Sequence, residues 1–323
     1  MAYTQAVLQR ARARYEQAKT ERAKEYEEHL RIAYQQYPRL KEIDRELRLT
    51  MVNLMASALH HGEDPVRAIE EIREQNLALQ REREWILEVA EYDEDYLDDS
   101  PICSQCGGTG YFGARMCSCL QELCRQEQRK ELTSLLGSGK ESFETFRLDF
   151  YSDEYDPKLG TSARKLMHSN WNICKKFAQN FTRGAGSLLF SGATGLGKTF
   201  LSACIARQVA DRGFSVMYET AIRIFSDFEE EKFGDGEPTG QTRKYFECDL
   251  LIIDDLGTEM TTQFTISVLY NIVNTRMMEE KPTIISTNLL PDMIEKRYSP
   301  QIASRVTGTY RLIKFVGNDI RRK

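Results

Sequence analysis

The sequence predicts an α/β domain with a parallel sheet in its C-terminal part, preceded by a long all-α region and a short cysteine-rich segment. Three observations predict this organisation. After about residue 160, short and wholly apolar runs alternate with helical patterns, as in parallel strands buried on both faces. Amphipathic periodicity without Gly or Pro covers Tyr3–Tyr37 and resumes up to about residue 90. Four cysteines lie within 17 residues between these two regions.

The composition indicates a chain that folds around apolar cores. Hydrophobic residues make up 41% and charged residues 29% of the 323 positions, which excludes disordered and fibrous classes. The length is about twice the ~150 residues of a typical domain, so two domains are expected. No run of about 18 apolar residues occurs, and Met1–Arg10 lacks the apolar core of a signal peptide. We therefore expect a cytoplasmic protein without a membrane partner.

The net charge of −5 is unevenly distributed along the chain. Residues 1–100 carry 15 Lys and Arg against 22 Asp and Glu, which leaves 29 basic and 27 acidic residues for the remainder. This balance argues against a general nucleic-acid coat protein and leaves room for a local basic patch. Scattered basic residues such as Arg243, Lys244 and Arg276 are the candidates for such a patch.

Residues 1–100 are expected to form two or three long helices, packed as a hairpin or as a coiled coil. The apolar period breaks at His61–Pro65, where Asp64 is suited to cap a helix that begins at Pro65. A solvated helical spacer and an interaction arm both fit this pattern. We expect His60 and His61 in a loop, and Trp85 and Trp171 in the core.

The region 136–323 is expected to be the α/β domain. Its apolar runs, the predicted strands, are Ser187–Phe190, Ser215–Tyr218, Leu250–Ile253 and Thr283–Ser286. The first of them leads directly into a glycine-rich segment that fits G-x-x-x-x-G-K-[ST] and precedes a helical pattern. Glycines let such a loop wrap its backbone N–H groups around phosphates, Lys198 reaches the β- and γ-phosphates, and the Thr199 hydroxyl ligates Mg²⁺. The predicted nucleotide-binding residues are Gly192, Ala193, Thr194, Gly195, Leu196, Gly197, Lys198, Thr199 and Phe200.

Polar side chains follow two further apolar runs. Asp254 and Asp255 end the run that begins at Leu250, and Asn288 follows the run that begins at Thr283. Since ligands of open parallel sheets bind at the carboxyl ends of the strands, we expect these groups beside the glycine-rich loop. Asp254 is assigned to Mg²⁺ through water, and Asp255 to orienting or deprotonating an attacking water. Asn288 is assigned to the γ-phosphate or to that water, although Asn also commonly forms turns.

The four clustered cysteines predict a structural zinc site. Cys103 and Cys106 form one tight pair, Cys117 and Cys119 form the second, and glycines lie between the pairs. Four thiolates suit a closed tetrahedral site, and Cys124 is an alternative ligand. We expect residues 101–135 to form this zinc-binding module. Cys174, Cys204 and Cys248 are isolated among apolar residues and are expected to pack as small hydrophobic side chains.

Taken together, these motifs resemble the AAA+ ATPases of the DnaC/DnaI helicase-loader and IstB group over roughly residues 140–323. The resemblance rests on the Gly192–Thr199 loop, on Leu250–Gly257, on Ser286-Thr287-Asn288, on Ala303-Ser304-Arg305 and on Gly317–Arg321. It implies an AAA+ fold with little or no helical lid and ATP hydrolysis. It also implies that Phe143–Phe146 enters the domain near the adenine. The cysteine module ahead of the ATPase domain is similar to that of DnaI-type loaders.

The resemblance assigns roles to three residues: Asn288, Arg305 and Arg321. Asn288 corresponds to sensor 1, and Arg305 to an arginine finger offered to the ATP of a neighbouring subunit. Arg321 corresponds to a sensor-2 residue, with Arg322 as an alternative. Together with Asp255, these are the predicted catalytic residues.

The expected function is ATP-dependent loading of a replicative hexameric helicase. The N-terminal region is expected to bind the helicase, and the ATPase domains to assemble with ATP between them and to contact single-stranded DNA. Two alternatives use the same core: an IstB-like transposition helper, and an ATP-binding adaptor that couples no work to hydrolysis.

Overall fold

The computed structural model describes residues 3–57, 65–93, 95–136, 141–234 and 240–322, and leaves aside the side chains of 51–57, 65–69, 71, 133–136 and 322. The chain divides into two compact units. Unit 1 comprises Met1–Arg12 and Ser118–Lys323, and unit 2 comprises Ala13–Cys117. The expected domain boundaries near residues 100 and 135 stay a prediction. None of the described helices combines the length and the apolar character that crossing a bilayer requires.

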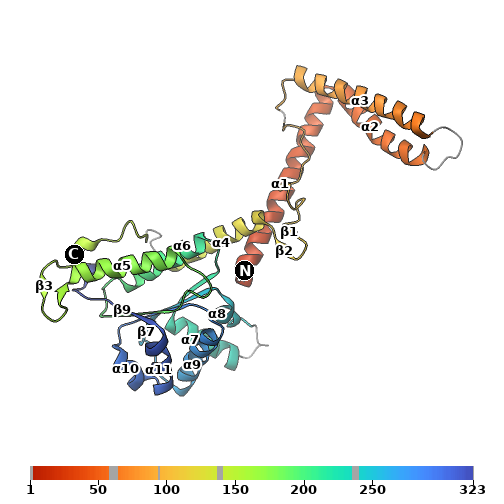
Figure 1. Cartoon of the computed structure of the whole chain (residues 1–323). Helices are drawn as coiled ribbons and strands as arrows, with labels where there is room; N and C mark the ends of the chain where they lie inside the picture. Colours follow the sequence, from red (N-terminus) through yellow and green to blue (C-terminus); the bar gives the residue numbers. More distant parts are fainter. Residues whose placement is uncertain (1–2, 58–64, 94, 137–140, 235–239, 323) are drawn as a thin grey trace. The chain divides into compact units, whose positions relative to one another are not determined.

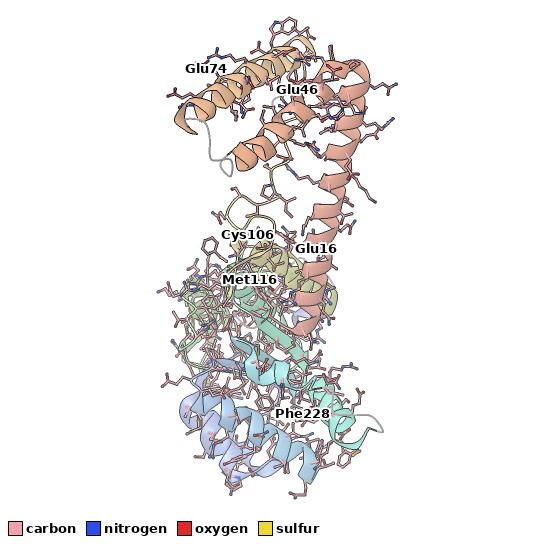
Figure 2. All side chains as sticks on the ribbon, turned by 90° about the vertical axis from the view of Figure 1, so that its right-hand side faces the viewer. Glu16, Glu46, Glu74, Cys106, Met116 and Phe228 are labelled. Atoms are coloured by element: carbon pink, nitrogen blue, oxygen red, sulfur yellow. The ribbon has the colours of Figure 1, made fainter. Side chains whose placement is uncertain are left out.

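Unit 2 is built on three helices. They are α1 (Gln5–Gln36, whose first turns belong to unit 1), α2 (Pro38–Ser57) and α3 (Pro65–Val89). Helices α2 and α3 lie side by side as a hairpin (Figure 1), around a small core of Ala33, Leu40, Ile43 and Ile86. Figure 2 shows Glu46 on α2 and Glu74 on α3 among many charged side chains. The hairpin alternative is therefore the one that the structure adopts.

Helix α3 starts where the sequence predicts, but one of its aromatic residues is not buried as expected. Helix α3 begins at Pro65 as predicted, whereas His60, His61 and Asp64 lie outside the described residues. The prediction that Trp85 is a core residue is wrong, because its side chain is 61% exposed. Its neighbour Ile86 occupies the buried face of α3, and one residue of helix turns the side chain by about 100°, away from that face.

The end of unit 2 is a short cysteine-rich loop. It contains a two-stranded antiparallel ribbon of β1 (Tyr111–Phe112) and β2 (Arg115–Met116). Figure 2 labels Cys106 and Met116 in this loop. Helix α4 (Ser118–Leu136) follows directly.

Unit 1 contains a five-stranded, wholly parallel sheet with the order β6-β7-β8-β5-β9. The strands are β5 (Leu188–Ser191), β6 (Val216–Thr220), β7 (Leu250–Leu256), β8 (Thr283–Thr287) and β9 (Arg311–Lys314). The four apolar runs are thus strands, as predicted. The fifth, β9, was not predicted because three of its four residues are exposed and leave no apolar run.

Helices cover both faces of this sheet (Figure 1). Helices α5 (Ala163–Gln179) and α6 (Lys198–Asp211) pack on one face, against Phe190, Tyr218 and Ile252. The other face carries α7 (Ala221–Phe233), α8 (Arg243–Glu247), α9 (Gln263–Met278), α10 (Pro291–Arg297) and α11 (Pro300–Thr309). The predicted fold class is confirmed: an α/β domain with a parallel sheet flanked by helices follows N-terminal helices and a cysteine cluster.

The remaining described elements frame the carboxyl edge of the sheet. They are the 3-10 turn η1 (Leu148–Phe150), the small ribbon of β3 (Tyr155–Asp156) and β4 (Thr161–Ser162), and the turn η2 (Ile320–Arg322). Of the residues described after β9, only η2 is helical.

Candidate functional site

The glycine-rich loop joins β5 to α6. Gly197 has φ +85° and precedes Lys198, the first residue of α6, so a residue without a Cβ suits this turn. At Gly192 a Cβ would lie 2.4 Å from the carbonyl oxygen of Phe315. The Lys198 ammonium donates to the carbonyl oxygens of Gly192 (2.7 Å) and Ala193 (2.9 Å), across the mouth of the loop. The N–H groups at the start of a helix, together with this ammonium, form a binding site for phosphate.

A cavity opens over this loop, at the carboxyl edge of the sheet. The chain's last described residues border it, since the Ile320 N–H donates to the Gly195 carbonyl oxygen at 3.0 Å. On another side, the Tyr151 hydroxyl donates to the Leu196 carbonyl oxygen at 2.9 Å. The lining residues are Glu141, Thr194, Gly195, Leu196, Gly197, Lys198, Thr199, Phe200, Ala203, Asp255, Ile320 and Arg321.

The predicted adenine-side segment lies beside the glycine-rich loop, although none of its residues is among those that line the cavity. The rings of Phe146 and Phe200 lie 5.6 Å apart between centroids, and Phe146 also approaches Gly197. Trp171 packs edge-on against Phe143 and donates its indole N–H to the Phe143 carbonyl oxygen at 3.0 Å. The segment 143–146 is therefore held beside the glycine-rich loop.

Asp254 lies beneath the cavity, with its carboxylate aimed at Thr199. The Thr199 hydroxyl is 3.5 Å from Asp254 Oδ1, so both oxygens face one point. The Tyr218 hydroxyl donates to Asp254 Oδ2 at 2.6 Å, and the Ser286 hydroxyl donates to Oδ1. Burial, and then the neighbouring Asp254 carboxylate, raise the pKa of Tyr218, so Tyr218 remains a donor. Hydroxyl and carboxylate oxygens are the ligands that Mg²⁺ prefers, and this pair fits the magnesium role predicted for it.

Asp255 points in a different direction because the sheet register shifts at this position. The β7–β8 pairing is irregular between Ile253 and Leu256, and Asp255 has φ +53°. Such a bulge re-aims a side chain, and positive φ outside glycine is typical of functional sites. Asp255 is exposed to the cavity, whereas Asp254 is 3% exposed. Desolvation and the Asp254 charge raise the pKa of Asp255, while Lys198 and Arg321 oppose this rise.

Ser286 connects the Asp254 carboxylate to the backbone of Asp255. Its hydroxyl donates to Asp254 and accepts the Asp255 N–H at 3.0 Å. Neither Ser286 nor Tyr218 was predicted as a site residue. Ser286 belongs to the Ser286-Thr287-Asn288 motif, in which only Asn288 was assigned a role, and its hydroxyl at the end of a predicted strand was a second signal. Tyr218 lies on a different strand and belongs to no motif.

The three other predicted catalytic residues occupy different places. Arg321 lines the cavity with Lys198 and Asp255. Asn288 follows β8 at the same edge, is exposed, and lies beside Gly257, but it is not among the lining residues. Arg305 lies on α11, outside this lining. The roles assigned to these residues stay predictions.

Arg305 is held in place by α9. Its guanidinium donates to Asn274 Oδ1 and to the Tyr270 hydroxyl, each at 2.9 Å, and lies 4.7 Å from the Tyr270 ring centroid. A partly exposed guanidinium fixed by a neighbouring helix suits a residue that acts on a second molecule.

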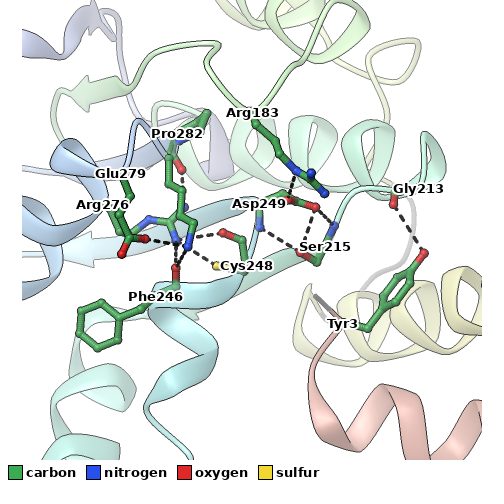
Figure 3. A network of polar contacts seen from close by, with 11 residues as sticks. Tyr3, Arg183, Gly213, Ser215, Phe246, Cys248, Asp249, Arg276, Glu279 and Pro282 are labelled. Atoms are coloured by element: carbon green, nitrogen blue, oxygen red, sulfur yellow. Dashed lines mark hydrogen bonds and ion pairs between the residues drawn. The ribbon is translucent and has the colours of Figure 1, made fainter. Parts of the chain in front are cut away.

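Arg276 is not available for DNA contact, contrary to the prediction from its charge. Its side chain is fully buried and donates to the carbonyl oxygens of Cys248 (3.0 Å) and Pro282 (2.7 Å), as Figure 3 shows. It also donates to the Thr283 hydroxyl at 2.9 Å. These contacts connect α9 to the start of β7 and β8. Of the two other candidates, Lys244 pairs with the buried Asp227 at 2.6 Å and Arg243 is exposed.

Another buried carboxylate anchors the start of β6 and β7. Asp249 accepts from the Ser215 N–H at 2.9 Å and pairs with Arg183 at 2.7 Å (Figure 3). Figure 3 also shows the Tyr3 hydroxyl, which donates to the Gly213 carbonyl oxygen at 3.5 Å. The charges of Asp249 and Arg276 therefore stabilise the amino edge of the sheet, opposite the cavity.

The cysteine cluster has the geometry of a tetrahedral metal site. The sulfur atoms of Cys103, Cys106, Cys117 and Cys119 all lie within 4.8 Å of one another. The Cys103 and Cys117 sulfurs are 3.9 Å apart. Two ligands on a tetrahedral zinc with Zn–S bonds of about 2.3 Å are separated by about 3.8 Å. Cys124, the alternative ligand, is not part of this group; burial raises the pKa of its thiol to about 11.

Hydrogen-bond partners surround one ligand of the cluster. Cys106 Sγ accepts the Gly110 N–H at 3.2 Å, and the Tyr15 hydroxyl lies 3.4 Å from it. Hydrogen bonds to a thiolate orient it and stabilise its charge, as is usual for the second shell of a metal. The four residues therefore fit zinc. The other three cysteines, Cys174, Cys204 and Cys248, are buried in the sheet core as expected.

Comparison with known proteins supports the nucleotide-binding interpretation. Residues 164–296 match the family described as IstB-like ATP binding protein. That stretch contains the glycine-rich loop, both carboxylates and Asn288, and it ends before Arg305 and Arg321. Over these residues the chain is thus similar to IstB-like ATP binding proteins.

Similar whole proteins include helicase loaders. The chain is 26% identical over 133 residues to the replicative helicase loader DnaC of Escherichia coli (strain K12), which is 41% of this chain and 54% of that protein. It is 24% identical over 196 residues to DnaC of Buchnera aphidicola subsp. Acyrthosiphon pisum (strain APS), 59% of this chain and 74% of that protein. The solved structure of DnaI aligns with 60% of this chain and 100% of its own, at 20% identity and TM-score 0.46. The chain spans about half the length of the Escherichia coli DnaC that it matches.

Proposed function

We propose that this protein is an ATPase that loads a replicative hexameric helicase during the initiation of DNA replication, in the cytoplasm. The observation that carries the proposal is the meeting of Lys198, Thr199 and Asp255 at one cavity, above Asp254. It is supported by the match of residues 164–296 to IstB-like ATP binding proteins and by similarity to the replicative helicase loader DnaC over 133 residues.

In the proposed reaction, different residues bind the phosphates, hold Mg²⁺ and orient the attacking water. The loop N–H groups and Lys198 bind the β- and γ-phosphates of ATP, and Thr199 and Asp254 hold Mg²⁺, which neutralises phosphate charge. Asp255 orients the attacking water and accepts its proton, and Asn288 orients the same water or the γ-phosphate. Arg321 contacts the γ-phosphate within the subunit. Arg305 supplies positive charge to the ATP of a neighbouring subunit, so that hydrolysis depends on assembly.

A surface of unit 1 suits single-stranded DNA. Phe233 at the end of α7 is 67% exposed, and its ring centroid lies 5.4 Å from that of Phe264 on α9. The Lys232 ammonium lies 5.2 Å from the first ring centroid and 5.0 Å from the second. Bases stack on exposed aromatic rings while cations contact phosphates, so we propose that single-stranded DNA binds here.

Anisotropy of a labelled oligothymidylate tests this surface. Phe233→Ala is expected to weaken binding by about tenfold, the effect of losing one stacked base. Met278→Ala, which removes another exposed apolar side chain from α9, serves as the control. Equal affinities for the two variants would place the DNA elsewhere.

Unit 2 is the proposed helicase-binding part. Its hairpin exposes apolar side chains, among them Leu77 (42%), Trp85 (61%) and Val89 (55%) on α3. An exposed apolar helix face of this kind is typical of protein interaction. Zinc in the cysteine cluster is proposed to stabilise the adjoining loop.

Native mass spectrometry with the replicative helicase of the host tests the loader function. We expect a defined complex whose composition differs between ATP, ADP and no nucleotide. Trp85→Glu is expected to abolish it, whereas the exposed neighbour Glu84→Ala leaves it intact. If no complex forms with the unsubstituted protein in any nucleotide state, the loader function is wrong.

The IstB-like match favours one second candidate, a transposition helper. That function predicts ATP-dependent binding to a transposase bound to DNA in place of the helicase, and the same mass measurement with a transposase complex distinguishes the two. An adaptor that does not hydrolyse ATP predicts normal binding of ATP with no release of phosphate.

A further inference from the structure

A buried carboxylate lies just beyond the end of β7. Glu259 is 6% exposed and is not among the residues that line the nucleotide cavity. Its two carboxylate oxygens accept hydrogen bonds from different parts of the fold. A buried carboxylate without such partners would be costly, so each of its contacts is a constraint on the structure around it.

One side of Glu259 faces the turn that begins at Asp255. The Asp255 carbonyl oxygen accepts from the Thr258 N–H (3.3 Å) and from the Thr258 hydroxyl (2.8 Å), which closes the turn. Within it, Gly257 has φ +104°, and its N–H donates to Glu259 Oε2 at 2.8 Å. Glu259 therefore fixes the backbone that aims Asp255 at the cavity.

The other side of Glu259 faces the end of α10. Tyr298 ends this helix and donates its hydroxyl to Glu259 Oε1, and Arg297 Nη2 donates to the Glu259 carbonyl oxygen at 2.7 Å. The next residue, Ser299, caps α11, and Arg305 lies on α11. The carboxylate thus joins the turn behind Asp255 to the start of the helix that carries Arg305.

We infer that Glu259 is a positioning residue that couples the Asp255 turn to the placement of Arg305, so that the subunit's own nucleotide site and its contribution to a neighbour's site move together. This inference rests on the proposed function, in which Asp255 acts within the subunit and Arg305 acts on the next one. The connection uses both oxygens of the Glu259 carboxylate, because Oε2 accepts the Gly257 N–H on the side of the Asp255 turn and Oε1 accepts the Tyr298 hydroxyl on the side of α10.

The test cuts one side of the connection and leaves the other. Tyr298→Phe removes the hydroxyl donor, keeps the ring, and leaves the Gly257 contact to Glu259 in place. The matched control is Tyr245→Phe, since Tyr245 is also buried and its hydroxyl donates to the carboxylate of Asp227 at 2.6 Å, away from both Asp255 and Arg305. ATP affinity, basal hydrolysis by dilute protein and hydrolysis stimulated by assembly are measured on the full-length chain.

Tyr298→Phe is expected to lower the stimulated kcat by about tenfold, the effect of losing one hydrogen bond to a charged group, while KM for ATP changes less than about twofold. Tyr245→Phe is expected to leave the ratio of stimulated to basal hydrolysis unchanged. Added to Arg305→Ala, Tyr298→Phe is expected to cause no further loss of stimulation, because both changes interrupt the same connection.

The outcomes separate the inference from the function on which it rests. If the unsubstituted protein shows no stimulated hydrolysis, the proposed function fails and the coupling fails with it. If stimulation is present and Tyr298→Phe leaves it unchanged, or reduces it no more than Tyr245→Phe does, the coupling alone is overturned. If Tyr298→Phe raises KM for ATP by the same factor by which it lowers kcat, and also lowers the melting temperature, Tyr298 only stabilises the fold.

Discussion

The nucleotide cavity and the cysteine cluster are both polar sites, but the chain assembles them in different ways. The cavity brings together Lys198, Asp255 and Arg321, which come from three distant parts of the sequence and are held by the sheet. The cluster takes all its ligands from the segment 103–119. A site of the first kind depends on the packing of a whole domain, and a site of the second kind on a local loop and its metal. We therefore expect that a change which abolishes ATP binding at the cavity leaves metal binding at the cluster intact, and the reverse.

The largest effect is expected at the loop lysine. Lys198→Ala removes the ammonium that faces the phosphates and is expected to lower ATP affinity at least about a hundredfold, because charge-assisted contacts to phosphate are strong. Zinc content, measured by elemental analysis, is expected to stay unchanged. The exposed Lys158→Ala is the control, and near-normal ATP binding by Lys198→Ala would reject the phosphate-binding assignment.

Removal of zinc tests whether the cysteine cluster can be disrupted without affecting the nucleotide cavity. A strong zinc chelator, or Cys103→Ser, is expected to abolish protection of residues 101–119 from hydrogen exchange, since a small metal site is held together by its ion. ATP affinity is expected to change less than about twofold, because the cavity does not use the cluster. A parallel loss of ATP binding would show that the two sites are not independent.

A smaller effect is expected for the partner of Asp254. Tyr218→Phe removes one hydroxyl that orients this carboxylate and is expected to raise the Mg²⁺ concentration for half-maximal hydrolysis by about tenfold, as for other groups that orient metal ligands. Tyr310→Phe, a buried tyrosine at the opposite edge of the sheet, is the control. Unchanged Mg²⁺ dependence in Tyr218→Phe would indicate that Ser286 alone orients Asp254.

The smallest expected effect is a shift in the pH dependence of kcat, caused by a change in the pKa of Asp255. Burial and Asp254 raise the pKa of Asp255, whereas Lys198 and Arg321 hold it down. Arg321→Met removes one opposing charge, so the pKa rises further and the acidic limb of the kcat profile moves to higher pH. Hydrolysis by Arg321→Met then begins to fall at a higher pH than in the unsubstituted protein, in addition to the lower plateau rate expected from the lost γ-phosphate contact. The exposed Arg311→Met leaves the limb in place. A limb that does not move would remove Arg321 from the surroundings of Asp255.

Several elements could be predicted because their information is local. The glycine-rich loop, the four apolar strands and the cysteine spacing each involve residues a few positions apart. Backbone geometry over such distances is nearly determined by residue type. The start of α3 at Pro65 belongs to the same class.

Other features depend on residues that are distant in sequence. Tyr218 and Ser286 meet at Asp254 only because β6 and β8 flank β7. Phe233 and Phe264 form one surface only because α7 packs beside α9. Charge alone suggested Arg276 for DNA, and residue type alone suggested a buried Trp85; in both cases the packing partner decided otherwise.

Local sequence patterns are enough to predict a glycine-rich loop of the phosphate-binding type, a strand ending in two carboxylates and a four-cysteine cluster. They do not predict that Asp254 is buried against Thr199 while Asp255 faces the cavity, or that Glu259 joins the Asp255 turn to α10; these features follow from the packing of the folded chain. The physical reason is that side-chain direction and burial depend on sheet register and on helix contacts. Both are set by long-range packing and leave no short-range pattern in the sequence.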